Sequence, residues 1–240
     1  MKIQHLCKSF DDRVVLDHVS LTLESGGTAC LMAPSGRGKT TLLRCIAGLE
    51  RPDSGQITDL PERIGYVFQE DRLCDGFSAV DNIRLVTGRA MDEGEICRHL
   101  KELGLADSLG QPVRELSGGM KKRAAIARVL AVDPAILMMD EPFAPLDAFT
   151  RQRLQDDILS LWENTGCTIL YVTHDLTEAI TLADRVVLMS ARPGRVVREY
   201  PIDLPRPRRV MDVKFSPRFV ELERAIWQEL EAVTPSTSFP

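Results

Sequence analysis

The amino-acid sequence predicts an α/β fold with a mainly parallel sheet, an N-terminal antiparallel β subdomain and an inserted α-helical subdomain. Three observations lead to this prediction. Polar and apolar residues alternate over the first two dozen positions, short continuous apolar runs recur along the rest of the chain, and stretches with helical periodicity separate most of those runs. Continuous apolar runs are typical of strands buried on both faces, and helices between them supply the crossovers that parallel strands require.

The length and composition fit one globular domain over residues 1–240. Hydrophobic residues make up 44% and charged residues 27%, which excludes a disordered or fibrous protein. The 30 Lys and Arg stand against 35 Asp and Glu, a net charge of -5, so no overall positive field attracts nucleic acid or anionic lipid. We therefore expect no nucleic-acid partner.

The sequence shows no pattern of a membrane span or a secretion signal. No apolar run approaches the roughly 18 residues that a transmembrane helix needs, and Met1–Phe10 lacks the apolar core of a signal peptide. The six cysteines include no CxxC pair and have no nearby His at metal-ligand spacing. We expect reduced, mostly buried thiols in a cytosolic protein that reaches any membrane through a partner.

The first predicted elements are two half-buried antiparallel strands. Ile3, His5 and Cys7 alternate with their neighbours, and the same period recurs over residues 19–23. Because successive side chains of a strand point to opposite faces, we expect Ile3, His5 and Cys7 on one face.

The main sheet is predicted from five later apolar runs. The run Ala29–Ala33 enters a Gly-rich loop, and Lys39–Ala47 is predicted to form the helix behind that loop. The other four runs are Ile64–Phe68, Ile136–Met139, Thr168–Thr173 and Val186–Met189. Helical patterns separate most of them, which favours parallel strands.

Two further segments lie outside this sheet. Between the second and third runs, Ile96, Leu100 and Leu103 repeat at helical spacing, which predicts an inserted helical subdomain over about residues 70–132. A C-terminal extension over about residues 201–240 begins Pro-rich and extended and ends in a helix. The apolar residues on one face of that helix are Phe219, Leu222, Ile226 and Leu230.

The segment Ala33–Thr40 carries the first chemical motif. Its sequence, APSGRGKT, fits the phosphate-binding pattern GxxxxGK[ST] except that the first glycine is alanine. Glycines let backbone N–H groups wrap around phosphates, Lys39 supplies charge, and Thr40 supplies a hydroxyl for Mg²⁺. A Gly-rich turn that binds nothing is the alternative, and the strand before it and the helix after it disfavour that interpretation.

Two adjacent carboxylates, Asp140 and Glu141, end the apolar run Ile136–Met139. A solvated strand end would look the same in isolation, but a phosphate-binding loop needs a carboxylate partner for Mg²⁺, which Asp140 supplies. Glu141 can then polarise or deprotonate an attacking water. Together these motifs predict the core of a P-loop nucleotidase.

A Ser-Gly-Gly turn provides a second anion-binding end. Ser117, Gly118 and Gly119 precede the predicted helix Met120–Val132, and backbone N–H groups at a helix start attract phosphate. A plain Ser N-cap before a flexible turn is the alternative. The position of the turn, about 20 residues before the two carboxylates, disfavours it.

With these motifs in this order, the sequence resembles the ABC ATPase family over essentially the whole chain. The resemblance implies that Phe10 stacks on adenine, with a core Phe as the alternative. It implies that Gln69 touches Mg²⁺ and senses a membrane partner, and that Asp147 is the dimer-contact aspartate. His174, which follows a predicted strand and precedes a helix start, matches the switch histidine that contacts the γ-phosphate.

The family pattern also distributes the remaining site residues. It assigns ATP binding to Phe10, Ala33, Pro34, Ser35, Gly36, Arg37, Gly38, Lys39, Thr40 and Thr41. It assigns catalysis to Glu141, His174 and Gln69, and Mg²⁺ to Thr40, Gln69 and Asp140. The signature motif that acts on the ATP of a partner chain is Ser117, Gly118, Gly119 and Met120. The resemblance therefore implies a homodimer with ATP and Mg²⁺ between two copies.

One branch of the family, the importers of nitrate, sulfonates and taurine, is similar in more detail. The segments that carry this likeness are Phe68–Leu73, Leu116–Met120, Asp140–Phe143, Leu146–Arg151, Arg192–Arg195 and Leu204–Arg208. In that branch, which also serves pyrimidine precursors of thiamine, the ATPase binds transmembrane permease subunits at the cytoplasmic face of the membrane. A solute-binding protein is an indirect partner, and the ATPase does not touch the solute.

Several positions depart from the family pattern without removing a charged or nucleophilic group. Ala33 replaces a glycine, Met120 stands where many relatives carry Gln, and Ala144-Pro145 stands where the branch often has Gly-Ala. Cys74–Phe77 departs from the usual Leu-Pro-Trp at the permease contact.

The sequence leaves two alternative functions open, and the C-terminal extension carries several arginines. Ala33 and Pro145 favour a degenerate, non-hydrolysing subunit. An ABC ATPase that acts on DNA or ribosomes usually carries a long coiled coil or two units, and the chain has about 80 residues between its phosphate motifs. The arginines of the C-terminal extension, Arg206, Arg208 and Arg209, are expected on a solvated face, with lipid headgroups as the alternative.

Overall fold

The computed structural model describes residues 1–33, 38–144, 146–190 and 193–233. Among these residues, no helix has the length and apolar content needed to cross a membrane. The six cysteines are unpaired, as expected, but only Cys30 and Cys45 are buried. The prediction of mostly buried thiols is therefore wrong.

A small antiparallel sheet begins the chain and confirms the predicted antiparallel pair. Its strands, in the order β2-β1-β4, are β1 (Lys2–Phe10), β2 (Arg13–Thr22) and β4 (Ser54–Thr58). The predicted faces are wrong at His5, which is exposed, whereas Ile3 and Leu6 are buried. His5 has a φ of 49°, and the pairing register shifts between Ile3 and Leu6. A β-bulge thus adds a residue and reverses the alternation.

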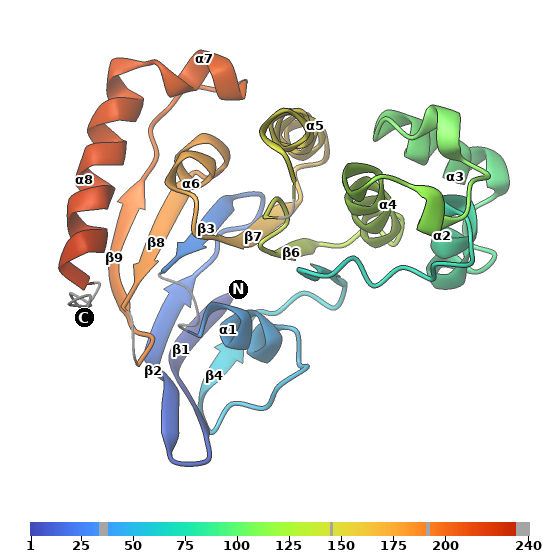
Figure 1. The fold of residues 1–240 in the computed structure, drawn as a ribbon. Helices are drawn as coiled ribbons and strands as arrows, with labels where there is room; N and C mark the ends of the chain where they lie inside the picture. The colour runs from blue at the N-terminus through green and yellow to red at the C-terminus, as the bar shows by residue number, and fades with distance from the viewer. Residues whose placement is uncertain (34–37, 145, 191–192, 234–240) are drawn as a thin grey trace, which may run out of the picture.

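The main sheet has six strands and confirms the mainly parallel prediction (Figure 1). In spatial order they are β5 (Ile64–Val67), β6 (Ile136–Asp140), β7 (Thr168–Thr173), β3 (Thr28–Met32), β8 (Arg185–Met189) and β9 (Val196–Pro201). The first five are parallel, and β9 joins β8 antiparallel. Every residue of β3, β6 and β7 is buried. Burial on both faces explains why these strands appear as continuous apolar runs.

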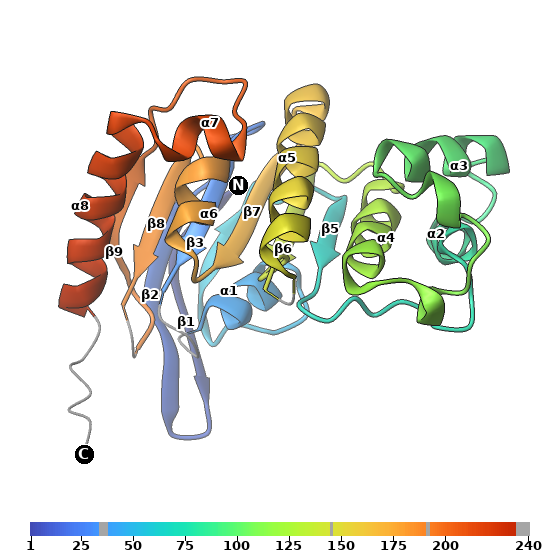
Figure 2. The same cartoon turned by 45° about the horizontal axis from the view of Figure 1, so that its top comes forward.

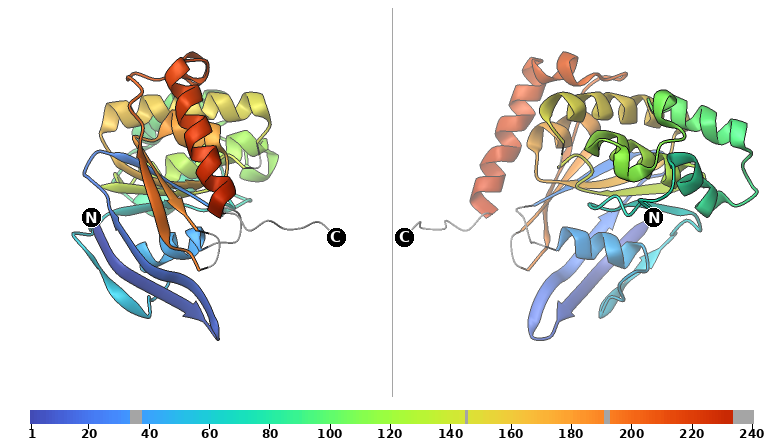
Figure 3. Two further views of the ribbon diagram at one scale, coloured as in Figure 1. Left: turned by 90° about the vertical axis from the view of Figure 1, so that its left-hand side faces the viewer. Right: turned by 45° about the vertical axis from the view of Figure 1, so that its right-hand side comes forward.

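Helices cover both faces of the main sheet. Helix α1 (Lys39–Ile46) lies between the two sheets (Figure 3), where Leu42 and Ile46 share a core with Leu6 and Leu16 of the small sheet. The helices on the opposite face (Figure 2) are α5 (Ala148–Thr165), α6 (Leu176–Leu182), α7 (Val210–Lys214) and α8 (Pro217–Val233). The apolar face predicted for the last helix is confirmed, since Phe219, Leu222 and Ile226 are buried in the core on that side.

Three helices stand to one side of the sheets (Figures 1 and 2). They are α2 (Ala79–Thr87), α3 (Glu93–Glu102) and α4 (Gly118–Leu130), with short 3₁₀ turns at Ala106–Ser108 and Val113–Glu115. Their own core contains Ile83, Ile96 and Leu100. Helix α4 also contacts β5 and α5, so it joins this group to the main sheet.

The arginines of the C-terminal extension differ from the expectation. Arg208 is buried and donates hydrogen bonds to the carbonyl oxygens of Thr181 and Ala183 at the end of α6 and to those of Ile202 and Leu204. Burial lowers its pKa to about 10.

The Arg206 side chain also packs against other residues of the protein. Its guanidinium lies 3.5 Å from the ring centroid of Trp162 and pairs with Asp184 at 2.7 Å. The solvated-face and lipid interpretations are therefore wrong for Arg208, which is buried, whereas Arg206 is partly exposed and Arg209 is exposed.

Candidate nucleotide site

The loop between β3 and α1 begins and ends at tightly packed residues. Ala33 is buried, and Gly38 has a φ of 90°. A Cβ at Gly38 would lie 2.9 Å from Leu16 Cδ2 and 3.0 Å from the Val15 carbonyl oxygen, so only glycine fits. The predicted ATP ligands Pro34, Ser35, Gly36 and Arg37 lie outside the described residues.

The start of α1 is suited to an anion. Gly38 offers no side chain to cap the helix, and the first turn holds no acidic residue. The backbone N–H groups and the helix dipole therefore present positive charge. Lys39 is 4% exposed, and its Nζ donates to the Ala33 carbonyl oxygen at 2.7 Å, so its ammonium lies across the loop.

Thr40 and Asp140 meet although 100 positions separate them. The Thr40 hydroxyl donates to Asp140 Oδ1 at 3.1 Å, and the Tyr66 hydroxyl lies 3.5 Å from Oδ2. Asp140 is buried at the end of β6, and burial raises its pKa. A hydroxyl and a carboxylate are the hard oxygen ligands that Mg²⁺ prefers, so the residues present fit this ion.

Glu141 and His174 lie beside this pair, at the ends of β6 and β7. Glu141 has a φ of 45° and donates its N–H to the Val172 carbonyl oxygen at 3.0 Å. Its Oε2 is 3.4 Å from His174 Nδ1, and the two side chains are 18% and 55% exposed. A non-glycine residue in the left-handed region is uncommon and is held here by the neighbouring strand. The carboxylate and the imidazole are thus together, with the imidazole exposed and the carboxylate mostly covered.

Gln69 lies on the loop that leaves β5. Strand β5 lies beside β6, and Val67 pairs with Met139. Gln69 comes two residues after Val67, so it follows β5 near the end of β6, where Asp140 and Glu141 stand. It is exposed. Its backbone carbonyl oxygen accepts a hydrogen bond from Lys122 at 3.0 Å.

A buried carboxyl next to His174 was not predicted from the sequence. The Thr173 hydroxyl donates to Glu178 Oε2 at 2.6 Å, and Asp175 accepts from the Glu178 backbone N–H at 3.0 Å. Asp175 and Glu178 therefore do not cap each other reciprocally, because the Glu178 side chain turns back to Thr173. Burial raises the pKa of Glu178 to about 7. The signal in the sequence was Glu178 itself, three residues after Asp175, but its burial is not visible there.

The Ser-Gly-Gly turn begins α4, as predicted. Ser117 is the N-cap, and its hydroxyl accepts from the Met120 backbone N–H at 3.4 Å. A Cβ at Gly119 would lie 2.4 Å from Thr150 Cγ2 on α5, so any side chain there would have to displace Thr150. Within one chain this turn lies apart from the start of α1 (Figures 1 and 2).

Two other predicted residues occupy exposed ends of elements. Asp147 caps α5 by accepting from the backbone N–H groups of Phe149 and Thr150, and hydrogen bonding to Thr150 holds its pKa below the usual value. Phe10 ends β1 with 44% of the residue exposed, and Lys8 Nζ lies 4.9 Å from its ring centroid. The exposed ring makes the alternative of a core Phe wrong.

The chain is similar in sequence to known ATP-binding proteins of transporters. A family model described as ABC transporter matches residues 16–144. An aliphatic sulfonates import ATP-binding protein, SsuB 2 of Pseudomonas syringae pv. tomato, is 42% identical over 84% of this chain and 87% of its own length. SsuB 1 of Pseudomonas aeruginosa is 44% identical over 84% and 86%. A putative ATP-binding protein of Brucella abortus is 38% identical over 93% and 90%.

Solved structures of ATP-binding cassettes have a similar fold. A dimeric ATP-binding cassette in a post-hydrolysis state, bound to ADP and Pi, superposes with a TM-score of 0.73 at 29% identity and covers 85% of this chain and 99% of that one. The cbiO1 protein of Clostridium perfringens, part of the ABC transporter complex cbiONQ, has a TM-score of 0.75 at 26% identity and covers 97% and 96%.

Proposed function

Because the chain belongs to the ABC transporter family, we propose that it is the ATP-binding and hydrolysing subunit of an importer for a small solute of the nitrate, sulfonate or taurine type. The main observation behind this proposal is the hydrogen bond from Thr40 to Asp140, next to the contact between Glu141 and His174. Relatives named for the import of aliphatic sulfonates favour a sulfonate as the solute.

In this proposal the chain's own residues divide the work of ATP hydrolysis. Lys39 and the N–H groups of the loop and of α1 hold the phosphates. Thr40, Gln69 and Asp140 are assigned to Mg²⁺, which neutralises charge on the phosphate oxygens when bound.

Glu141 is assigned as the base of the reaction. It accepts a proton from the water that attacks the γ-phosphorus, a contribution of about 10²- to 10⁴-fold in rate. His174, 3.4 Å from Glu141, is placed to contact the γ-phosphate. Nothing in these residues favours a non-hydrolysing subunit, because the base and the metal ligands are all present.

The partners follow from the same proposal. Ser117–Met120 lies apart from the start of α1, so it serves the ATP of a second copy, with Asp147 at the dimer contact. Residues 70–132 are proposed as the helical subdomain of one ATPase domain spanning 1–240, with 201–240 as an extension. The dimer binds transmembrane permease subunits at the cytoplasmic face of the membrane, and a solute-binding protein delivers the solute to that permease.

Removing the Lys39 ammonium tests the phosphate site. Lys39→Ala should weaken ATP binding by at least about 100-fold, because charge-assisted hydrogen bonds to phosphate contribute roughly 1.5–3 kcal/mol each. Lys101→Ala, an exposed lysine on α3, is the matched control and should bind ATP normally. Calorimetric titration measures both, and unchanged affinity in Lys39→Ala would contradict the site.

Growth tests the solute. Cells that lack this chain should fail to grow on an alkanesulfonate as the sole sulfur source and should recover with the wild-type chain but not with Glu141→Gln. Growth on the sulfonate without the chain, in cells with no other sulfonate importer, would contradict the sulfonate assignment and leave the ATPase assignment intact.

A further inference from the structure

A buried lysine near the start of α4 has no role in the mechanism above. Lys122 stands five residues after Ser117 and is 0% exposed. Lysine is almost never fully buried unless its ammonium is paired, because the charge loses its hydration. Its partners therefore show what this burial accomplishes.

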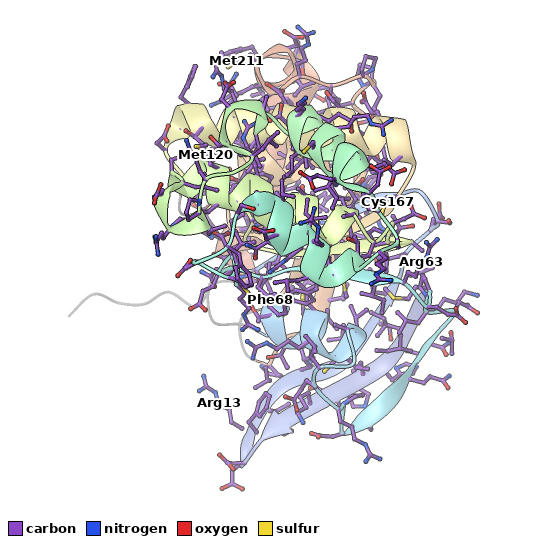
Figure 4. The ribbon with its side chains drawn as sticks, turned by 90° about the vertical axis from the view of Figure 1, so that its right-hand side faces the viewer. Arg13, Arg63, Phe68, Met120, Cys167 and Met211 are labelled. Carbon is purple, nitrogen blue, oxygen red and sulfur yellow. The ribbon has the colours of Figure 1, made fainter. Side chains whose placement is uncertain are left out.

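The Lys122 ammonium contacts the backbone and one side chain of a single loop. Nζ donates to the carbonyl oxygens of Phe68 and Gln69 at 3.3 and 3.0 Å, and it pairs with Asp71 Oδ1 at 2.6 Å. The two carbonyl oxygens thus accept two of the three N–H donors of the ammonium, and the Asp71 carboxylate balances its charge. The loop is the one that carries Gln69 out of β5, and Figure 4 labels Phe68 within it.

A second cation of α4 holds the rest of the loop. Arg128 donates to the carbonyl oxygens of Arg72 and Asp71 at 2.8 and 3.2 Å, and burial lowers its pKa. In the described part of the chain, none of the backbone hydrogen bonds of turns and loops involves residues 68–72. Side chains of α4 therefore set the path of this loop.

We infer that Lys122 is a positioning residue that makes the Gln69 loop and the Ser117 end of α4 move as one body. This inference rests on the proposed function, in which Gln69 serves the ATP bound by its own chain and Ser117–Gly119 the ATP bound by the partner. Because one ammonium joins the two, a shift of the loop at one ATP is carried to the helix that closes the other. Asp71 completes this clamp by neutralising the buried charge.

The test removes the clamp without leaving a buried charge. Lys122→Met alone would orphan Asp71, so the main variant is Lys122→Met with Asp71→Leu, since replacing both partners of a buried ion pair by apolar groups is often tolerated. A second variant, Lys122→Gln with Asp71→Asn, is neutral but keeps an N–H donor for the loop. Lys101→Met, an exposed change in the same group of helices, is the control.

The first measurement needs no nucleotide. Exchange of the Cys74 amide hydrogen, which follows the loop and donates to Asn82 Oδ1 at 2.8 Å, should be about tenfold faster in the Met/Leu variant, intermediate in the Gln/Asn variant and unchanged in the control, while exchange in β7 stays constant. Equal acceleration in β7 would show a general loss of stability and overturn the positioning role. Unchanged exchange at Cys74 would overturn it too. If the Met/Leu variant does not fold, the Gln/Asn variant decides by the same criterion.

The second measurement is ATP turnover. The Met/Leu variant should lose about tenfold or more in kcat with KM for ATP nearly unchanged, because the clamp acts on closure rather than on the first binding of ATP. Wild-type turnover in that variant would overturn the inference and leave the ATPase proposal standing. An inactive wild-type chain would instead refute the ATPase proposal, and the exchange result would still decide the clamp.

Discussion

The exposed ring of Phe10 sits at the end of β1 with a lysine beside it, which suits a stacking surface for a base. Phe10→Ala should weaken ATP binding by about 1–3 kcal/mol and leave turnover at saturating ATP nearly unchanged. Phe215→Ala, a more exposed phenylalanine after α7, should have no effect. Because stacking tolerates any base, GTP should compete appreciably, and strict selectivity for adenine would argue against this geometry.

Glu178 makes stability depend on pH. Its pKa in the folded chain is about 7, above the ordinary 4.5, mainly because of burial. Between these values the folded state holds a proton that the unfolded chain has lost, so the free energy of unfolding falls as pH rises toward 7 and stays low above it. The ion pair with Arg151, at 3.8 Å, offsets only part of this cost.

Glu178→Gln should therefore raise the free energy of unfolding at pH 8 by up to about 3 kcal/mol and change it little at pH 4.5. Denaturant titrations at the two pH values measure the difference. Glu102→Gln, at an exposed position on α3, should show no such pH dependence. A stabilisation that is equal at both pH values would contradict a raised pKa.

Single residues also show the limit of sequence analysis. The phosphate loop, Asp140, Glu141 and His174 could be predicted because each stands at the end of an apolar run. Lys122 could not, because its partners are backbone carbonyl oxygens more than 50 positions away.

The spacing of the cysteines along the sequence also says little about which side chains come together across two strands. Cys7, Asp17 and His18 bring their donor atoms within 4.8 Å of one another across β1 and β2, although they are not adjacent in a motif. Asp17 is already paired with Arg195 and His18.

Among the elements, α6 is held at both ends. Asp175 caps its start, next to His174, and Arg208 binds the carbonyl oxygens of Thr181 and Ala183 at its end. Last-turn carbonyl oxygens have no partner within their own helix, and cationic side chains satisfy them well. The Leu-Pro-Arg-Pro-Arg segment therefore serves as a distant cap for the helix that follows the switch histidine.

Arg208→Met keeps much of the side-chain volume and removes the donors. It should lower the free energy of unfolding by about 2–4 kcal/mol, since several buried carbonyl oxygens lose their partners. Arg209→Met, at the exposed neighbour, should change it by less than about 0.5 kcal/mol. Thermal or denaturant unfolding compares the two, and equal effects would refute the capping role.

A helix or strand could be predicted when the pattern of its own residues sets its structure, and could not when pairing with another element sets it. The buried strands β3, β6, β7 and β8 begin and end within one residue of the predicted bounds. Strand β4 was not predicted, because Ser54–Thr58 is mostly exposed and is a strand only through its pairing with β1. Helix α7 has five residues, too few for a period to show.

At the scale of the whole molecule, the proposed site is complete only between two copies. Glu141→Gln keeps the shape and hydrogen bonding of the side chain but not its basicity, so ATP should bind, hydrolysis should stall and a closed dimer should accumulate. Adding Ser117→Arg should abolish that dimer, because the bulky cation fills the space at the facing γ-phosphate. Size-exclusion or sedimentation with saturating ATP measures both species.

Two outcomes would contradict the shared site: a Glu141→Gln chain that stays monomeric with ATP, or a double variant that dimerises as well as the single one. A monomeric result calls for repetition with the permease present, since alignment by the membrane partner belongs to the proposal. Lys101→Ala in the Glu141→Gln background is the control and should dimerise fully.

The strand order β5-β6-β7-β3-β8-β9 also determines when the main sheet can form during translation. Strand β3 begins at Thr28 and leaves the ribosome early, yet its two neighbours, β7 and β8, begin at Thr168 and Arg185, 140 and 157 residues later. At about 5–20 residues per second, β3 waits roughly 7–30 s with both edges unpaired. An apolar strand with open edges is prone to aggregate. A nascent chain halted before Met189 should therefore be a substrate for chaperones or proteases, because the pairing of β3 with β8 is still incomplete.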